Sequence, residues 1–147
     1  MGRRVVRITA DANVLVRTIV QDNEAQAAIA QALLLQATVI AVPIPVLCEV
    51  AWVLGRGYGY GADEVAAAIR AITGIDTVVT DAPAAEAGLA TLRAGGDFAD
   101  GAIASQGERL GGAVFASFDR SAVAMLRQHG AGAADPGELT AEAAPGA

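Results

Sequence analysis

The sequence contains no lysine, and all ten of its basic residues are arginines. This absence excludes mechanisms that need an ammonium group, such as a phosphate-loop lysine, Schiff-base chemistry, or the lysine of receiver domains and haloacid-dehalogenase-like phosphatases. Aromatic residues make up only 4% of the sequence, whereas 54% of its residues are hydrophobic. We therefore expect a core built from aliphatic side chains and alanine.

Cysteine and long hydrophobic runs are also scarce. Cys48 is the only cysteine, so no intramolecular disulfide can form. Residues 1–13 lack the apolar run of a secretory signal peptide. The longest apolar stretch, residues 39–48, is interrupted by Pro43 and Pro45, and it is far shorter than the roughly 20 residues of a membrane span. We expect a cytoplasmic protein that does not associate with membranes.

Acidic residues outnumber basic ones by sixteen to ten, which gives a formal net charge of −6. A protein with this charge repels a phosphodiester backbone overall, so any binding of nucleic acid must be local. The length of 147 residues is typical of one domain. At this size folding buries roughly 70% of the unfolded chain's surface, so a core can form without disulfides or a structural metal.

Short apolar segments typical of buried strands alternate with segments that favour helices. The expected strands are residues 5–10, 38–42, 77–80 and 113–118. The expected helices are residues 13–21, 22–37, 45–54, 62–74, 81–96, 97–112 and 120–130. This alternation predicts an α/β fold in which helices cover both faces of a parallel sheet. In such sheets, ligands bind beyond the carboxyl ends of the strands.

The last part of the chain differs from the rest in composition. Residues 131–147 are mostly alanine, glycine, proline and glutamate without periodicity, which predicts a disordered tail after a domain of residues 1–130. The alternating glycines of residues 55–61 do not match a dinucleotide-binding fingerprint, and we interpret them as a connecting loop.

Five acidic residues occupy positions typical of a functional site. Asp11 follows the first expected strand and Asp119 follows the last, so both should project from the same carboxyl edge of the sheet. Asp97 and Asp100 are three residues apart at the start of a helix, which places both carboxylates on one face. Glu49 lies in an otherwise apolar helix, where an unpaired buried charge would cost several kcal/mol.

A hard divalent cation is the simplest partner for these carboxylates, because the sequence has no lysine and few arginines near them. Mg²⁺ and Mn²⁺ prefer carboxylate and water oxygens, and no cluster of cysteine and histidine suggests zinc. Such a site predicts phosphodiester hydrolysis. Each aspartate also has a purely structural interpretation, as a helix cap or a turn residue.

Four segments resemble the PIN-domain ribonucleases, and within them the VapC-like toxins of toxin–antitoxin pairs. They read ITADANVLVR, VPIPVLCEVAWVL, GGDFADGAIASQGERLGG and AVFASFDRS, and they follow one another in the order of that family. The resemblance implies a PIN-like three-layer sandwich with a parallel sheet of about five strands. It also implies a carboxylate pocket that binds Mg²⁺ or Mn²⁺ and cleaves RNA endonucleolytically.

The resemblance assigns roles to individual residues. It implies that Asp11, Glu49, Asp100 and Asp119 hold the metal, and that Asp97 assists them or helps to deprotonate the attacking water.

Two polar residues beside these acids match the same family. Asn13 and Ser117 resemble groups that orient the carboxylates or water. The implied partners are an RNA substrate, a cognate antitoxin that blocks the pocket, and a second copy of the chain in a homodimer.

The sequence leaves other interpretations open. A non-cleaving PIN-like module could bind RNA or protein through the apolar helices around residues 29–35 and 46–54. An RNase H-like nuclease shares the four-acid arrangement, whereas a receiver domain lacks support because lysine is absent. Gly101 replaces a better helix former and is expected to loosen its turn by about 1 kcal/mol.

Because lysine is absent, contacts with the substrate are left to arginines. The candidates are Arg17, Arg56, Arg93 and Arg120.

Overall fold

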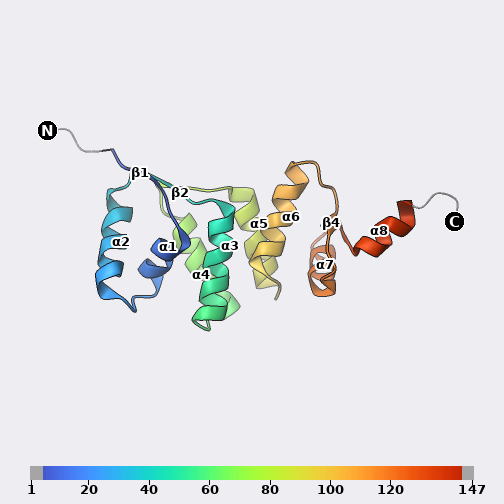
Figure 1. Ribbon diagram of the computed structural model, residues 1–147, viewed down its shortest axis with the longest axis horizontal. Helices are drawn as coiled ribbons and strands as arrows, with labels where there is room; N and C mark the ends of the chain where they lie inside the picture. Colours follow the sequence, from blue (N-terminus) through green and yellow to red (C-terminus); the bar gives the residue numbers. More distant parts are fainter. Residues whose placement is uncertain (1–4, 144–147) are drawn as a thin grey trace. The chain divides into compact units, whose positions relative to one another are not determined.

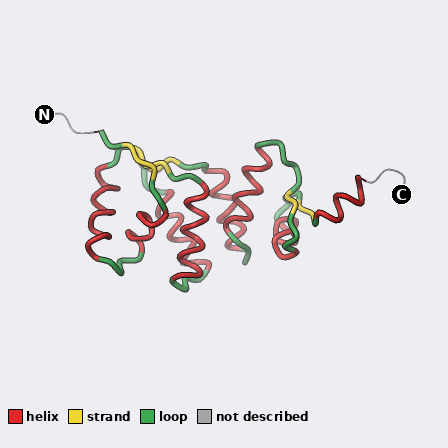
Figure 2. Tube along the Cα trace, in the orientation of Figure 1, coloured by secondary structure: helices red, strands yellow, loops and turns green. Residues whose placement is uncertain are grey.

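The computed structural model describes residues 5–143 (Figure 1). The chain forms two compact units. The N-terminal unit ends at Ala82 and the C-terminal unit begins at Pro83, and each is described by itself. Both units consist mainly of helices with short strands (Figure 2). No helix in this described part of the chain is long and apolar enough to cross a membrane.

The N-terminal unit has a three-stranded parallel sheet in the order β1-β2-β3. Its elements are β1 (Arg7–Thr9), α1 (Ala12–Ile19), α2 (Glu24–Gln36), β2 (Val39–Ala41), α3 (Ile44–Trp52), the π-helix η1 (Val53–Gly57), α4 (Ala62–Thr73) and β3 (Val78–Val79). Ile8 pairs with Ile40, which in turn pairs with Val78. Helix α1 packs against α2 and α3, and α3 packs against α4.

Aliphatic side chains form the core of the N-terminal unit, as the composition predicts. Leu15, Ile40, Leu47, Val50 and Ile69 are fully buried and come from four helices and strands of the unit. Burying side chains of this size contributes about 1.5–3 kcal/mol each. The sheet and its helices are therefore held together by aliphatic packing.

Proline residues mark the start of α3, and a π-helix follows its end. Pro43 is the N-cap of α3, and Pro45 lies in the first turn, where a missing N–H group is tolerated. The expected stop at Gly55 is not observed, because the chain continues as η1 to Gly57. The backbone N–H of Tyr58 donates to the carbonyl of Val53 at 3.1 Å, which is the five-residue spacing of a π-helix.

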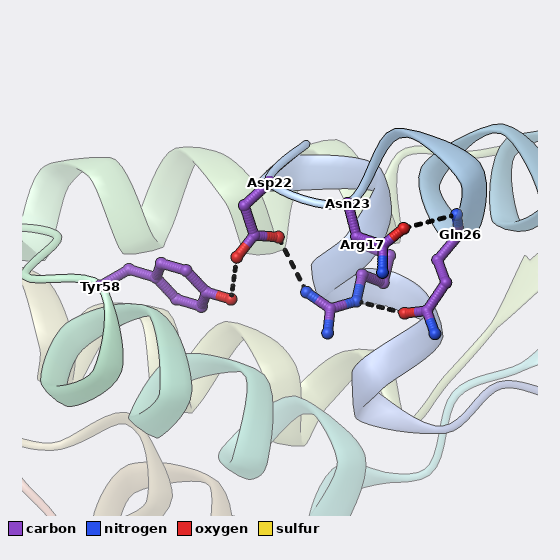
Figure 3. Close-up of polar contacts among 5 residues, drawn as sticks. All are labelled: Arg17, Asp22, Asn23, Gln26 and Tyr58. Atoms are coloured by element: carbon purple, nitrogen blue, oxygen red, sulfur yellow. Dashed lines mark hydrogen bonds and ion pairs between the residues drawn. The ribbon is translucent and has the colours of Figure 1, made fainter.

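A polar cluster joins the turn between α1 and α2 to the segment after η1 (Figure 3). Arg17 on α1 donates through Nε to Gln26 and through Nη1 to Asp22, each at 2.8 Å. The hydroxyl of Tyr58 donates to the second carboxylate oxygen of Asp22 at 3.0 Å. The capping residue of α2 is Asn23, whose side chain accepts from the N–H of Gln26. Asp22, one residue before this cap, connects two segments through its bonds with Arg17 and Tyr58.

Replacing Tyr58 with phenylalanine is expected to destabilise the protein by about 0.5–1 kcal/mol, because an exposed hydrogen bond to a charged group is lost. Tyr60→Phe is the matched control, since the Tyr60 hydroxyl forms no hydrogen bond with the described residues. Urea unfolding of both variants gives the comparison. Equal midpoints for the two variants would show that the bond to Asp22 contributes nothing.

The C-terminal unit contains four helices and a two-stranded parallel sheet within its described residues. Its elements are α5 (Ala82–Arg93, which begins at the boundary), α6 (Phe98–Arg109), β4 (Phe115–Ala116), α7 (Arg120–Gln128), β5 (Ala133–Ala134) and α8 (Pro136–Ala143). Phe115 pairs with Ala133, and Ala116 pairs with Ala134. Helix α6 packs against α7, and α7 packs against β5.

Two glycines allow α5 and α6 to approach each other closely. A Cβ atom on Gly101 would lie 2.5 Å from the carbonyl oxygen of Ala87 and would also overlap the side chain of Thr91. A Cβ atom on Gly88 would lie 2.6 Å from the ring of Phe98, which is almost fully buried. Gly101 therefore has a packing role besides the expected propensity cost, because its small size permits the close approach of α5 and α6.

The α/β class and the parallel strands are confirmed, but the single five-stranded sheet is not. The five strands of the described chain form one sheet of three and one of two. The strands are also shorter than predicted. For example, β4 has two residues where the sequence predicts a strand of six. Apolar composition identifies a segment that can form a strand, whereas the strand itself extends only where a neighbour pairs with it.

The expected disordered tail is also corrected for most of its length. β5 and α8 lie within residues 131–147, and only residues 144–147 of that segment fall outside the described part. Ala133 and Ala134 are buried, and the side chain of Asp135 accepts from the N–H of Gly137 at 2.7 Å. Composition was misleading here because alanine, besides being common in disordered segments, is the best helix former and fits a tight strand pair.

Candidate active site

Three of the predicted acids lie close together in the C-terminal unit. Asp97 is the N-cap of α6 and Asp100 lies in its first turn, as the spacing predicts. Asp119 is the N-cap of α7, the helix that packs against α6. The side chain of Asp97 makes no capping hydrogen bond, so its exposed carboxylate is not committed to its own helix.

Asp100 is the acid most affected by its surroundings. Partial burial raises its pKa above the ordinary value, and the neighbouring charges of Asp97 and then Asp119 raise it further. These three causes all disfavour the ionised form of Asp100. A cation would reverse the electrostatic balance, because it favours ionised carboxylates.

The position of Asp119 is fixed by two short-range hydrogen bonds. Its carboxylate accepts from the N–H of Ala122 at 3.1 Å and so caps α7. Its own N–H donates to the hydroxyl oxygen of Ser117 at 3.0 Å. Ser117 therefore shapes the turn that leads from β4 into the acid.

The remaining two acids belong to the N-terminal unit. Asp11 follows β1 and caps α1, with its carboxylate accepting from the N–H of Ala12 at 2.8 Å. β1 and β4 belong to different sheets, so the expectation that one sheet edge carries both Asp11 and Asp119 is corrected.

Glu49 is exposed on α3, which corrects the expectation of a buried carboxylate. Its neighbours on the same face, Pro45 and Trp52, are exposed too, and Trp52 retains 65% of its accessible surface. The apolar residues adjacent to Glu49 in the sequence lie on other faces of the helix. The exposed position leaves its carboxylate available to a ligand without the cost of burying an unpaired charge.

The donor groups fit a hard cation in their chemistry. Carboxylate oxygens are the ligands that Mg²⁺ and Mn²⁺ prefer. The pKa of Asp100 is raised first by partial burial and then by the neighbouring charges of Asp97 and Asp119. Within neither unit, however, do the described residues place three histidine, cysteine, aspartate or glutamate side chains so that they could hold one metal ion.

The other predicted residues are dispersed. Asn13 is exposed on α1, where it lines a shallow hollow between α1 and α2. Arg17 lines the same hollow but is engaged with Asp22 and Gln26. Arg120 is exposed next to Asp119.

One arginine was missing from the predicted set. Arg127 lies seven residues after Arg120 on α7, and both arginines line a hollow beside this helix. Their spacing, which places both on one face of a helix, was a signal that the sequence offered.

The fold and the acids agree with the comparison to known families. The family model described as PIN domain matches residues 8–125, a span that includes all five candidate acids. The chain therefore belongs to the PIN-domain family, whose members are commonly nucleases that use divalent metals. A search of curated proteins finds no significant match.

Proposed function

We propose that the protein is a metal-dependent endoribonuclease that hydrolyses RNA phosphodiester bonds. The observation that carries the proposal is the group formed by Asp97, Asp100 and Asp119, in which partial burial and then the charges of the other two acids raise the pKa of Asp100. Carboxylates gathered in this way are typical of sites that bind a divalent cation. Membership of the PIN-domain family supports hydrolysis as the reaction.

The proposed ligands are Asp11, Glu49, Asp100 and Asp119. Bound Mg²⁺ or Mn²⁺ would supply polarisation of a phosphoryl oxygen and stabilisation of the leaving oxygen. Asp97 is suited to accept a proton from the attacking water, because its carboxylate is exposed and makes no capping bond.

Ser117 and Asn13 have the supporting roles in this proposal. Ser117 holds the backbone at Asp119, and Asn13 follows Asp11 by two residues on α1.

The biological role that we propose is that of a toxin neutralised by a cognate antitoxin, with the toxin itself forming a homodimer. Exposed apolar side chains support binding of a protein partner: Ile29 and Leu35 on α2 are 70% and 87% exposed, and Trp52 lies on α3. Covering these large apolar side chains with a protein partner would remove their surface from water.

A non-cleaving module that binds RNA or protein is the alternative. It is favoured by the absence, among the described residues of each unit, of three acids arranged around one ion. The two functions differ in whether RNA is cut.

Cleavage of a structured RNA in the presence of Mn²⁺ is the test of the proposed function. The wild-type protein should cut the RNA in Mn²⁺ but not in EDTA. Asp11→Asn should reduce the rate by at least about 100-fold, because the amide retains the cap of α1 but binds a cation poorly. Gel electrophoresis of the products over time measures both rates.

The matched control is Asp63→Asn, which makes the same charge change at an exposed position on α4. Its rate should stay within about twofold of the wild type, as for a surface substitution away from special features. Intact RNA in every reaction, with wild-type protein and Mn²⁺ present, would favour the binding module over the nuclease.

A further inference from the structure

A hollow on the C-terminal unit lies between α7 and the segment that forms β5 and α8. Its volume is about 350 Å³. One wall is a single face of α7 that carries Arg120, Val123, Ala124 and Arg127, whereas Asp135 and Glu138 line the other wall. The hollow therefore presents two guanidinium groups opposite two carboxylates.

The two arginines are separated by two turns of α7, which corresponds to about 10.5 Å along the helix axis. Arg120 is exposed, and it directly follows the candidate ligand Asp119. Ser117, whose hydroxyl holds the backbone of Asp119, also lines the hollow. The hollow thus begins beside the candidate active site and extends away from it along α7.

One hydrogen bond orients the side chain of Arg127, and a second pairs it with a carboxylate. Its Nε donates to the carbonyl oxygen of Ala133 at 2.7 Å, which fixes the plane of the guanidinium group. Its Nη2 donates to Oε2 of Glu138, also at 2.7 Å. The backbone bond leaves the outer edge of the guanidinium directed at an anion, and in this structure the anion is a carboxylate of the same chain.

Several features allow another anion to displace the Glu138 carboxylate from Arg127. The side chains of Arg127 and Glu138 retain 50% and 54% of their accessible surface, so water and salt screen the ion pair. Glu138 belongs to α8, which lies beyond the region that matches the PIN domain. In Figure 1, α8 (red) projects from the end of the unit beside α7 and away from α5 and α6.

We propose that Arg127, together with Arg120, binds a phosphate of the RNA backbone, and that Glu138 competes with this phosphate for the guanidinium group of Arg127. This inference rests on the proposed function, because it takes RNA as the substrate. Guanidinium groups bind phosphate through paired, charge-assisted hydrogen bonds, and a carboxylate has a similar geometry. A chain with a net charge of −6 needs such local cations to hold a polyanion.

Glu138→Gln in the full-length protein is the direct test. Binding of a short, fluorescently labelled oligouridine is followed by anisotropy in EDTA, so that no RNA is cleaved. Freed from the carboxylate, Arg127 should increase the affinity for RNA by about fivefold at low salt, roughly the effect of one exposed charged contact. The logarithmic dependence of affinity on salt should become steeper by about 0.7, as for one additional phosphate contact with a single strand.

Glu108→Gln is the matched control, because it makes the same charge change at an exposed position near the end of α6 in the same unit. It should bind RNA less than twofold more tightly than the wild type, as for a charge distant from the contact. Adding Arg127→Gln to Glu138→Gln should remove the gain. Equal affinities of the Glu138→Gln and Glu108→Gln variants would overturn the proposal, as would a double variant that binds as tightly as Glu138→Gln alone.

The outcome is separable from that of the proposed nuclease function. If Glu138→Gln strengthens binding but no protein cuts RNA in Mn²⁺, the phosphate site stands and the nuclease proposal fails. If the wild type cuts RNA and Glu138→Gln binds no more tightly than the control, the nuclease proposal stands and the phosphate site fails.

Discussion

Replacing Asp100 with asparagine is expected to raise the melting temperature by about 2 °C or more at pH 7 in EDTA, while lowering RNA cleavage in Mn²⁺ by at least about 100-fold. Burial, Asp97 and Asp119 together raise the pKa of Asp100, so its ionised form destabilises the folded protein. The amide removes this charge at similar size. The same charge is needed to bind the cation, so activity should be lost while stability increases.

The stabilisation should depend on pH in a defined direction. Because the folded pKa of Asp100 is above the unfolded value, ionised Asp100 costs stability at neutral pH. That cost decreases as the pH falls through the folded pKa and disappears below the unfolded value. The advantage of Asp100→Asn should therefore be largest near neutral pH and vanish in acid, as melting curves across this range would measure.

Two comparisons make the result specific to the acidic group. Glu108→Gln, on the same helix, should change stability by no more than about 0.5 kcal/mol. Mn²⁺ at 100 times its dissociation constant should stabilise the wild type by about 2.7 kcal/mol, and Asp100→Asn much less. A lower melting temperature for Asp100→Asn in EDTA would contradict the electrostatic account, and equal responses to Mn²⁺ would exclude Asp100 as a ligand.

The second large effect is a loss of stability, and it is expected at the uncharged residue Gly101. Gly101→Ala should destabilise the protein by about 3 kcal/mol, at the upper end of the usual cost of overpacking. The new Cβ atom would lie 2.5 Å from the carbonyl oxygen of Ala87, and backbone cannot rotate away as a flexible side chain can. Helices α5 and α6 would have to separate. Urea unfolding monitored by circular dichroism measures the loss.

Gly107→Ala provides a control on the same helix. Nothing lies within 4 Å of a Cβ atom at Gly107, so alanine there should stabilise α6 by about 0.5–1 kcal/mol through its higher helix propensity. The two substitutions are chemically identical and should have opposite signs. Stabilisation by both would mean that α5 and α6 are not in close contact at Gly101.

The helix starts were predicted well because their causes are local. Asp97 and Asp119 are N-caps where the sequence places helix starts, and Pro43 begins α3. These residues act within one turn of the backbone, through a side-chain acceptor or a fixed φ angle. The spacing of Asp97 and Asp100 therefore predicted correctly that they share the start of α6.

Features that depend on distant parts of the chain were predicted poorly. The apolar neighbours of Glu49 suggested burial, yet its own face of α3 includes the exposed residues Pro45 and Trp52. The sequence order of a helix does not show which stripe faces the core when nearly every residue is apolar. The role of Gly101 depends on Ala87 and Thr91 of another helix, and no local rule contains that contact.

The pairing of β4 with β5 has a practical consequence for where the protein can be cut. The N–H of Phe115 donates to Gly132 at 2.8 Å, and the N–H of Ser117 donates to Ala134 at 3.2 Å. A fragment that stops at residue 130 would retain Asp119 but would leave both donors without an acceptor, on a bare strand edge open to self-association. Shortened versions intended for crystallisation should therefore extend at least through Ala134, although the match to the PIN-domain model ends at residue 125.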